Sequence, residues 1–542
     1  MTLHAATPGE RTGQALEEAV AAPLPTRLSA LPALPRGASL ADGAASVSAV
    51  VVPVAAVADD ADSGPGRRVP QPRRGAAEAA VSFGADVAAW AEVSSVTGKA
   101  GDVLAVAASG GREGTGRGTL PQRLIFLGVG DESARGLRAA GAALAKATAG
   151  LDVVRSSVVD GLAGPLQAAF AEGFLLGGYR PPRAGRNSGP KPMASVLELT
   201  GASADVLRRA AATAQAVWLA RNLANMPSNV KNPAWMAAQA ARLADGSGLQ
   251  IRIRDAQDLA REGFGGLLAV GSGSASEPRL VELSYTPATP APAGSRHIVL
   301  AGKGITFDSG GVSLKPREAM VPMKTDMAGA GVVLAVLSAA AELGVGHRVT
   351  GLLPLAENAI GAGSYRPGDV VEVYGGTTVE IGNTDAEGRM VLADVLAYAA
   401  AELRPDVLVD IATLTGAASL GLGRRHAALY SNRPDLVPVF ETASAESGER
   451  IWHMPLAEVQ EEYGFALESS VADLSHIASA ASKVGGGSIT AALFLKEFVG
   501  DTPWVHLDIA GPARADADEA EVAKGATGYG TRLLLAFLRG VA

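Results

Sequence analysis

From about residue 229 onward, short apolar runs of the kind found in β-strands alternate with longer segments of helical pattern. The apolar runs cover residues 297–301, 349–355, 406–411 and 504–509, and the helical segments between them cover 327–343, 389–402 and 488–499. This alternation predicts a mixed, mainly parallel sheet with helices on both faces. Ligands bind beyond the carboxyl ends of the strands in such sheets, so the residues after each run are the first candidates for chemistry.

The N-terminal part also has an α/β pattern, on a smaller scale. A Val-rich strand is expected over 48–57, a loop over 59–75, and a strand at 124–127 that leads through a glycine turn into a helix over 132–147. This turn does not predict dinucleotide binding, because Ser133 stands where the third glycine of that fingerprint belongs.

The chain of 542 residues is long enough for several domains. Residues 203–225 predict a long helix with Ser203 as its N-cap, in a linker spanning 201–228. We therefore expect a smaller α/β domain over 45–200 and a larger domain over 229–542. Residues 1–44, rich in Ala, Pro and Leu, are expected to form a disordered extension without the features of a secretory signal.

Composition excludes several kinds of protein. No uncharged apolar run approaches the roughly 20 residues of a membrane-spanning helix. The absence of cysteine removes disulfides and thiolate chemistry, which suits a reducing compartment. The net charge of −8 provides no overall attraction for nucleic acid or anionic lipid, although a local basic patch remains open.

The first group of chemically active residues follows the run at 297–301. Here Lys303, Asp308, Lys315 and Asp326 lie within a glycine-rich stretch, and Lys324 is also close by. The chain has only ten lysines, so three of them within 22 residues indicate that an amine is needed there. Charged side chains at the end of an apolar strand are costly unless they bind something.

The second group, Asn383 to Arg389, follows a predicted hairpin over 370–381 and precedes an apolar helix. Asp385 and Glu387 can point the same way in an extended loop, which suits chelation. With Asp308 and Asp326 they would balance two divalent ions and leave Lys315 and Arg389 to stabilise negative charge that develops during a reaction. Oxygen ligands favour ions such as Mg, Mn or Zn.

This pattern predicts a hydrolase in which two metals polarise a carbonyl and activate a water, with the general base left open. Each residue alone also has a simpler interpretation. Asp308 could be a turn residue, and Asp385 could cap the following helix. Lys303 and Arg389 could be solvated surface cations, so it is the joint occurrence that favours a site.

These residues resemble the leucyl aminopeptidase family, the M17 peptidases or cytosol aminopeptidases. Residues 383–389 match the family signature without a substitution, and 302–311 resemble its other metal-binding block. Further similar stretches lie at 365–369, 410–416, 488–498 and 506–511, so the resemblance covers about 200–540 well and 45–200 loosely. Residues 424–426 and 478–487 depart from the pattern, which leaves substrate preference and loop geometry open.

The resemblance implies a role for each matching residue. The metal ligands would be Lys303, Asp308, Asp326, Asp385 and Glu387, with Lys303 as a neutral amine. Lys315 would polarise the scissile carbonyl, and Arg389 would anchor a bicarbonate ion that serves as general base. The pocket for a Leu-like first side chain would be formed by Met323, Thr413, Leu414, Gly416 and Ala510.

The resemblance also implies an architecture and partners. The expected fold is a smaller, macro-domain-like N-terminal α/β domain, a linking helix and a larger α/β catalytic domain. The expected protein is a cytoplasmic homohexamer with two divalent ions per subunit (Mn or Zn, also Mg or Co) that acts on peptides and binds no membrane. The alternative is a DNA-binding architectural protein with incidental peptidase activity, for which a basic patch comprises Arg67, Arg68, Arg73 and Arg74.

Overall fold

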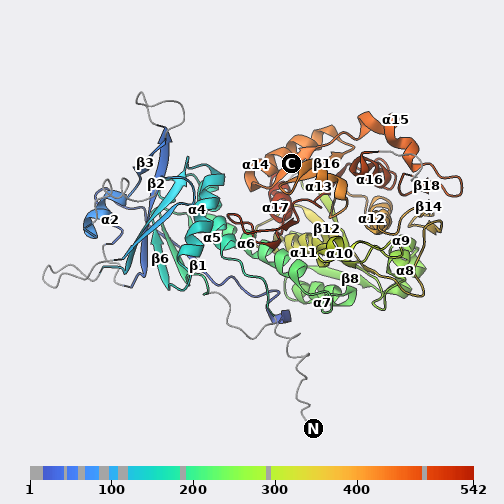
Figure 1. Ribbon diagram of the computed structural model, residues 1–542, viewed down its shortest axis with the longest axis horizontal. Coiled ribbons are helices and arrows are strands. Elements are labelled where there is room, and N and C mark those ends of the chain that lie inside the picture. The colour runs from blue at the N-terminus through green and yellow to red at the C-terminus, as the bar shows by residue number, and fades with distance from the viewer. Residues whose placement is uncertain are drawn as a thin grey trace, which may run out of the picture.

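A computed structural model of the chain describes residues 16–41, 46–58, 68–84, 97–107, 120–183, 191–287, 294–478 and 485–541. Figure 1 shows two α/β domains side by side, with one long helix, α6 (Ala204–Asn225), between them. The fold class predicted from the alternation of strands and helices is confirmed.

The N-terminal domain is built on a seven-stranded sheet in the order β1-β7-β6-β2-β5-β4, with β3 paired to β2. The pairs along β1, β7, β6, β2 and β5 are parallel, and β3 and β4 are antiparallel to their neighbours. The strands are β1 (Arg27–Leu31), β2 (Ala49–Ala58), β3 (Arg68–Pro72), β4 (Val103–Ala107), β5 (Arg123–Gly130), β6 (Val153–Ser156) and β7 (Val196–Thr200). The helices are α2 (Ala76–Ser82), α4 (Ala134–Ala147) and α5 (Gly164–Gly177).

Two expectations for this domain are wrong. Within the segment expected to be a disordered extension, β1 pairs in parallel with β7 over its whole length. Within the expected loop 59–75, β3 pairs with β2. Both strands are short and lack a clear hydrophobic alternation, and the prolines of β3 suit only an edge strand, so neither shows the usual sequence signal. Residues 1–15, 42–45 and 59–67 lie outside the described part.

Helix α6 packs against both domains with two different faces. Ala210, Ala214 and Val217 belong to the core of the N-terminal domain, whereas Ala216 and Leu223 belong to the core of the larger domain. Its N-cap is Ser203, as predicted, with the hydroxyl accepting from the backbone N–H of Val206. A helix that is apolar on two faces suits a position between two cores.

Residues 16–24, which we call the N-terminal strap, lie against α6 and the larger domain. Leu16 and Val20 are buried in the core that contains Trp235. The side chain of Asn222 donates to the carbonyls of Ala19 and Val20 at 3.1 and 3.0 Å. The chain therefore contacts the larger domain before it enters the sheet of the smaller one at β1.

The larger domain is built on a nine-stranded sheet in the order β17-β16-β19-β15-β10-β12-β9-β8, with β11 paired to β12. The central strands β19, β15, β10 and β12 are parallel, as are β11 with β12 and β16 with β17. The strands are β8 (Gln250–Arg254), β9 (Arg279–Tyr285), β10 (His297–Gly302), β11 (Gly304–Asp308), β12 (Arg348–Asn358), β15 (Val407–Ala412), β16 (His426–Ser431), β17 (Arg450–His453) and β19 (Trp504–Asp508). The predicted hairpin is present as β13 (Val370–Glu372) and β14 (Thr378–Glu380), with β18 (Leu474–Ser475) beside it, and β20 (Arg514–Ala515) pairs with β21 (Gly525–Ala526).

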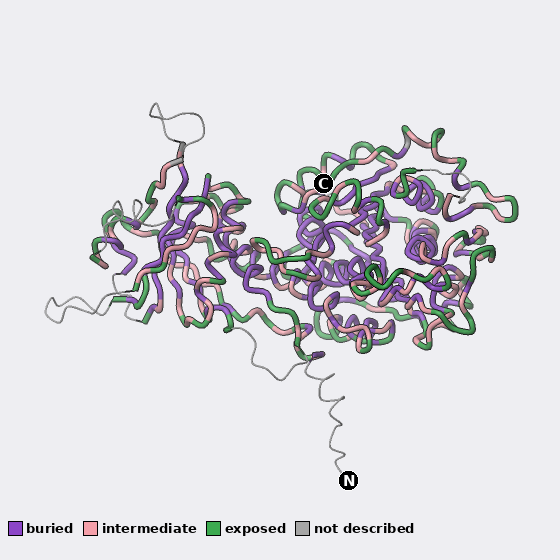
Figure 2. The backbone as a smooth tube through the Cα atoms, viewed as in Figure 1, coloured by how far each residue is buried: buried purple, intermediate pink, exposed green. Residues whose placement is uncertain are grey.

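Helices cover both faces of this sheet, and Figure 2 shows that much of the backbone inside the larger domain is buried. The buried apolar residues form two cores. The first core contains residues of α7 (Pro233–Ala244), α11 (Ala328–Ala340), α14 (Val437–Ser447) and α17 (Thr531–Gly540). The second contains residues of α8 (Ala256–Glu262), α9 (Gly265–Gly271), α12 (Glu387–Tyr398), α13 (Gly416–Leu422) and α16 (Gly487–Lys496).

One helical stretch of the described chain, 317–340, has the length and composition of a membrane span. It includes α11, and 72% of its most apolar window is buried inside the larger domain. Its apolar character is accounted for by packing against the sheet.

Candidate metal centre

The predicted ligands gather beyond the carboxyl ends of the central strands. Lys303 lies between β10 and β11, and Asp308 is the last residue of β11. Asp326 follows a short 3-10 turn, η1 (Met323–Thr325), that leads into α11. Asp385 and Glu387 lie where the hairpin leads into α12, with Glu387 as the first residue of that helix. Segments up to 84 residues apart in sequence thus meet at the position expected for a ligand site.

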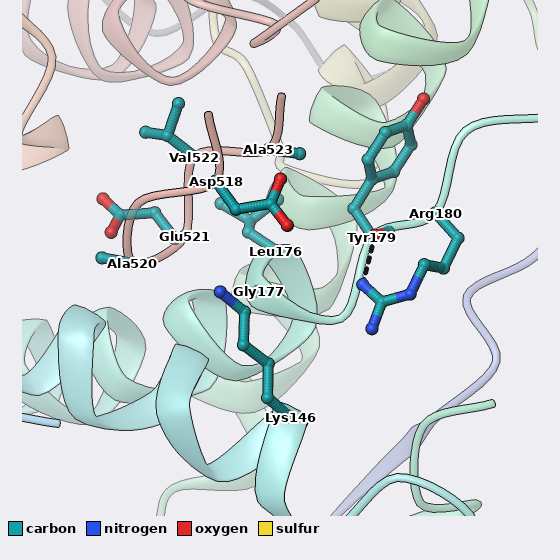
Figure 3. A pocket seen from close by; sticks show the side chains of 10 residues that line it. All are labelled: Lys146, Leu176, Gly177, Tyr179, Arg180, Asp518, Ala520, Glu521, Val522 and Ala523. Carbon is teal, nitrogen blue, oxygen red and sulfur yellow. Dashed lines mark hydrogen bonds between the residues drawn. The ribbon is translucent and has the colours of Figure 1, made fainter. Parts of the chain in front are cut away.

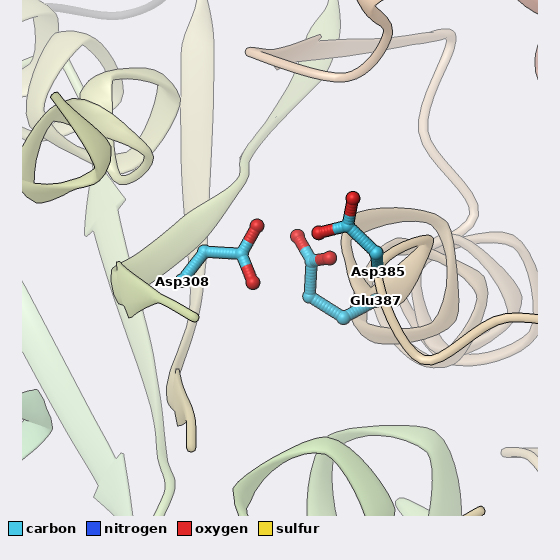
Figure 4. Close-up of side chains that lie close together, drawn as sticks. All are labelled: Asp308, Asp385 and Glu387. Atoms are coloured by element: carbon cyan, nitrogen blue, oxygen red, sulfur yellow. The ribbon is translucent and has the colours of Figure 1, made fainter. Parts of the chain in front are cut away.

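Three of the carboxylates form a compact group. Asp308, Asp385 and Glu387 each offer an oxygen that lies within 4.8 Å of the other two. Figure 4 shows Asp308 approaching from one side and the other two carboxylates facing it. Asp308 and Glu387 are buried, and Asp385 is partly exposed. The group therefore has one side open to an incoming ligand.

The two lysines connect this group to the remaining carboxylate. The Lys303 Nζ atom lies 2.9 Å from Oδ2 of Asp326 and 2.9 Å from Oε1 of Glu387. The Lys315 Nζ atom lies 2.7 Å from Oδ2 of Asp308 and also contacts Asp385. All four predicted carboxylates and both lysines therefore form one continuous cluster.

Negative charge is crowded in this cluster. Burial raises the pKa of the Asp326 carboxyl to about 8, and repulsion from Glu387 adds to the effect against the attraction of Lys303. Burial also raises the pKa of Asp308 and of Asp385. Burial opposes the charged form of Lys303, but the surrounding carboxylates outweigh it and raise the pKa of the amine.

The donor set fits divalent cations. Four carboxylates face two ammonium groups, and Oε2 of Glu387 is buried without a hydrogen-bond partner in the described part of the chain. A buried carboxylate oxygen without a donor is costly, and a cation would remove that cost. The residues that would hold ions are the predicted ones: Lys303, Asp308, Asp326, Asp385 and Glu387.

Glycines at two positions allow these side chains to approach one another. A Cβ atom on Gly388 would lie 2.5 Å from Cε of Lys303, so a larger residue would displace the amine. Gly311 has a φ of 61°, and a Cβ atom there would lie 2.8 Å from the side chain of Asn358. The glycine-rich character of both motifs thus has a direct steric cause.

Arg389 is buried at the edge of the cluster. Its guanidinium donates to the backbone carbonyl of His476 at 2.6 Å, and its Nε atom has no hydrogen-bond partner within the described ranges. Burial lowers the pKa of the guanidinium to about 10. An unused donor on a buried cation suits an anion as partner.

The residues predicted for the substrate pocket lie next to the cluster in part. Thr413 donates its hydroxyl to Asp326 at 2.7 Å and its carbonyl accepts from Lys303 at 2.9 Å. Met323 lies in the turn before Asp326. A Cβ atom on Gly416, the first residue of α13, would meet no atom within 4 Å.

Asp508 organises the rest of the predicted pocket. One of its oxygens accepts from the backbone N–H groups of Leu414 and Ala510 at 3.2 and 3.1 Å. The other accepts from the backbone and hydroxyl of Thr415 at 3.1 and 2.6 Å. Residues 414, 415 and 510 are therefore held together by one buried carboxylate.

Sequence reasoning missed Asp508 and two further supporting residues. Asn358 donates to Asp308 at 2.8 Å and to the carbonyl of Thr384 at 2.9 Å. Tyr365 donates to that same carbonyl at 3.0 Å. Asn358 and Asp508 are the last residues of β12 and β19, so a polar residue at the carboxyl end of an apolar run was the available signal.

A cavity of about 10 Å³, enough for one water, lies elsewhere, between the two domains (Figure 3). It is lined from the N-terminal domain by Lys146 and Tyr179 and from the larger domain by Asp518 and Glu521, among others. None of the cluster residues lines it, so it is separate from the candidate site.

This chain has an α/β fold with a buried cluster of carboxylates and amines beyond the strand ends. Such an arrangement is typical of α/β enzymes. Comparison with known proteins identifies the family. The model of the cytosol aminopeptidase family catalytic domain matches residues 218–535. A probable cytosol aminopeptidase of Geobacter sulfurreducens is 41% identical over 437 residues, which cover 78% of this chain and 86% of that protein.

A probable cytosol aminopeptidase of Streptomyces avermitilis is 44% identical over 399 residues, covering 69% of this chain and 75% of the relative. Among solved structures, the bottromycin maturation enzyme BotP in complex with Mn has a TM-score of 0.75 and 36% identity, covering 91% of this chain and 99% of BotP. The chain belongs to the cytosol aminopeptidase family, and the predicted resemblance is confirmed. It is an M17 family aminopeptidase, a hydrolase.

Proposed function

We propose that the protein is a metal-dependent aminopeptidase that removes N-terminal residues from peptides with two divalent ions held by the cluster. The observation that carries the proposal is the meeting of Asp308, Asp385 and Glu387, whose oxygens lie within 4.8 Å of one another. The Mn complex of BotP supports Mn as one suitable ion. When bound, such ions act as Lewis acids on the peptide carbonyl and lower the pKa of a bound water.

The protein's own cations would act on the substrate. Lys315 is partly buried and within reach of Asp308, so its ammonium is held at the mouth of the cluster. There it would stabilise the negative oxygen that develops when the carbonyl carbon is attacked. Arg389, with its unused Nε–H donor, would hold a bicarbonate ion that accepts the proton of the attacking water.

The amine of the substrate would be recognised at the buried end of the cluster. Asp326 can accept from a peptide N-terminus, which would restrict cleavage to the first residue of the chain. Thr413 and Met323 flank Asp326, and with Leu414, Gly416 and Ala510 they would surround the first side chain. This set carries no charged side chain, so we propose a preference for Leu-like residues.

The decisive experiment is hydrolysis of leucine p-nitroanilide by the purified protein before and after chelation. We expect activity to vanish on removal of metal and to return with Mn²⁺ or Zn²⁺. A folded protein that stays inactive with every divalent ion would contradict the proposal.

Assembly and location are further parts of the proposal: a cytoplasmic homohexamer, to be tested by mass measurement in solution and by cell fractionation. The alternative function in DNA binding gains no support from its basic patch. Arg73 lies 3.7 Å from Glu132, and Arg74 pairs with Asp160, so both are partly neutralised within the N-terminal domain. Arg67 lies outside the described residues. A gel shift at low salt would test this alternative.

A further inference from the structure

Two lysines that the catalytic cluster does not contain lie directly behind the turn that carries Asp326. Lys231 is 1% exposed, and its Nζ donates to the carbonyl of Ala224 at 3.2 Å and to the carbonyl of Lys324. The side chain of Lys324 runs the opposite way and donates to the carbonyl of Asn225 at 2.8 Å. We call this reciprocal pair the lysine clamp.

The clamp joins the end of α6 to the turn η1. Ala224 and Asn225 are the last two residues of α6, so their carbonyls are among those without a partner inside the helix. An ammonium group at a helix C-terminus is favoured by the helix dipole. On the other side, Lys324 lies two residues before Asp326 and within η1.

The buried amine of Lys231 calls for a specific explanation. No ion pair joins it to a carboxylate in the part of the chain that the structure describes, and burying an amine is costly without compensation. Packing alone would be served by an apolar side chain of similar length. The hydrogen bonds to two carbonyls, one in each element, are what an apolar side chain would not provide.

The end of α6 is itself fixed. The side-chain amide of Asn225 donates to the hydroxyl of Tyr179 at 3.1 Å and its oxygen accepts from the backbone N–H of Ala526 at 3.1 Å. These contacts reach the N-terminal domain and the strand β21. The clamp therefore ties η1 to a point that is held from both domains.

We propose that Lys231 is a positioning residue for Asp326, acting with Lys324 by fixing the backbone of η1. The inference rests on the proposed function of two bound ions, and it assigns Asp326 and Lys303 to one of these ions and Asp385 to the other. Loss of the clamp would leave Asp326 free to shift relative to Lys303 and Thr413, which both contact it. The ion held by Asp308 and Asp385 would be unaffected.

The test is calorimetric titration of the chelated, full-length protein with Mn²⁺. We expect Lys231→Met to weaken one of the two binding events at least tenfold and to leave the other unchanged. Asp385→Asn should weaken the other event, so the double variant should weaken both. Lys99→Met is the matched control, because Lys99 is exposed in the N-terminal domain, and it should bind as the wild type does.

A purely structural role would lower stability without separating the two sites. If Lys231→Met binds both ions with wild-type affinity, the proposal is overturned while the proposed function stands. If the wild type binds no Mn²⁺, both are overturned. Should Lys231→Met fail to fold, Lys324→Met replaces it, and faster hydrogen exchange of residues 324–327 than in the control is then required. Unchanged exchange there overturns the proposal.

Discussion

The residues of the cluster divide into those that would hold ions and those that would stabilise charge. Asp385 lies among the three converging carboxylates, whereas Arg389 contacts the backbone of His476 and none of the carboxylates at hydrogen-bond distance in the described chain. Substitutions at these two positions should therefore have different effects.

We predict that Asp385→Asn lowers the metal content, because a neutral amide is a weaker ligand than a carboxylate. Arg389→Ala should keep its metal and lose about 100-fold in kcat, because the bicarbonate base would no longer be held. Elemental analysis with kinetics on the same samples distinguishes the two. Equal loss of metal in both variants would contradict the division into ligands and charge stabilisers.

His476 supports the loop that carries the second motif. Its ring accepts from the backbone N–H of Gly382 at 3.1 Å, and its other nitrogen lies 3.0 Å from the carbonyl of Asn383. The neutral ring with its proton on the second nitrogen satisfies both contacts. Burial lowers the pKa of His476 to about 3, and the charge of Arg389 adds to the effect.

This lowered pKa gives a pH dependence of stability. The folded pKa lies below the unfolded value of about 6.5, so the stabilisation is present above pH 6.5 and is lost as pH falls towards 3. Between pH 7 and pH 5, the free energy of unfolding of the wild type should fall by about 2 kcal/mol because of His476. We predict that His476→Gln lacks this part of the fall. Urea unfolding at the two pH values measures it, and parallel losses in both proteins would exclude His476 as the cause.

At the scale of single elements, the ends of the strands carry the site. Asp508 at the end of β19 accepts hydrogen bonds from the backbone N–H groups of Leu414, Thr415 and Ala510 and from the hydroxyl of Thr415. An amide in its place would turn an N–H group towards these donors.

We therefore predict that Asp508→Asn lowers kcat/KM for leucine p-nitroanilide at least tenfold with the metal content unchanged. Asp501→Asn, at an exposed position, is the control and should behave as the wild type does. Metal lost from Asp508→Asn would instead mean that this carboxylate supports the cluster itself.

The elements also show what sequence can predict. The buried parallel strands and their helices were predictable because long apolar runs and helical periodicity are local signals, and β10, β12, β15 and β19 lie where expected. The ligands were predictable because they lie in two short motifs. Lys231 was not, because it acts on a segment remote in sequence and has no motif around it. Asn358 and Asp508 carried only the weaker signal of a polar residue at the end of an apolar run, and the segments that they hold are remote in sequence. β1 is held by pairing with β7, a contact that no local pattern records.

At the scale of the whole molecule, the N-terminal strap joins the domains. Val20 is 1% exposed in the core of the larger domain, whereas its neighbour Ala21 is exposed. We predict that Val20→Asp lowers the free energy of unfolding by about 3 kcal/mol, because an unpaired charge enters an apolar core. Ala21→Asp should change it by less than about 0.5 kcal/mol. Equal effects in denaturant unfolding would show that the strap does not contribute to stability.

The strap also fixes an order of events during synthesis. Residues 16–24 leave the ribosome well before the side chains that hold them, because Gln215, Asn222 and Trp235 are made about two hundred residues later. Strand β1 likewise waits for β7 before it has a neighbour. During synthesis, the buried apolar side chains of the strap therefore stay uncovered until α6 and α7 have left the ribosome, which happens only after all strands of the smaller sheet have been made.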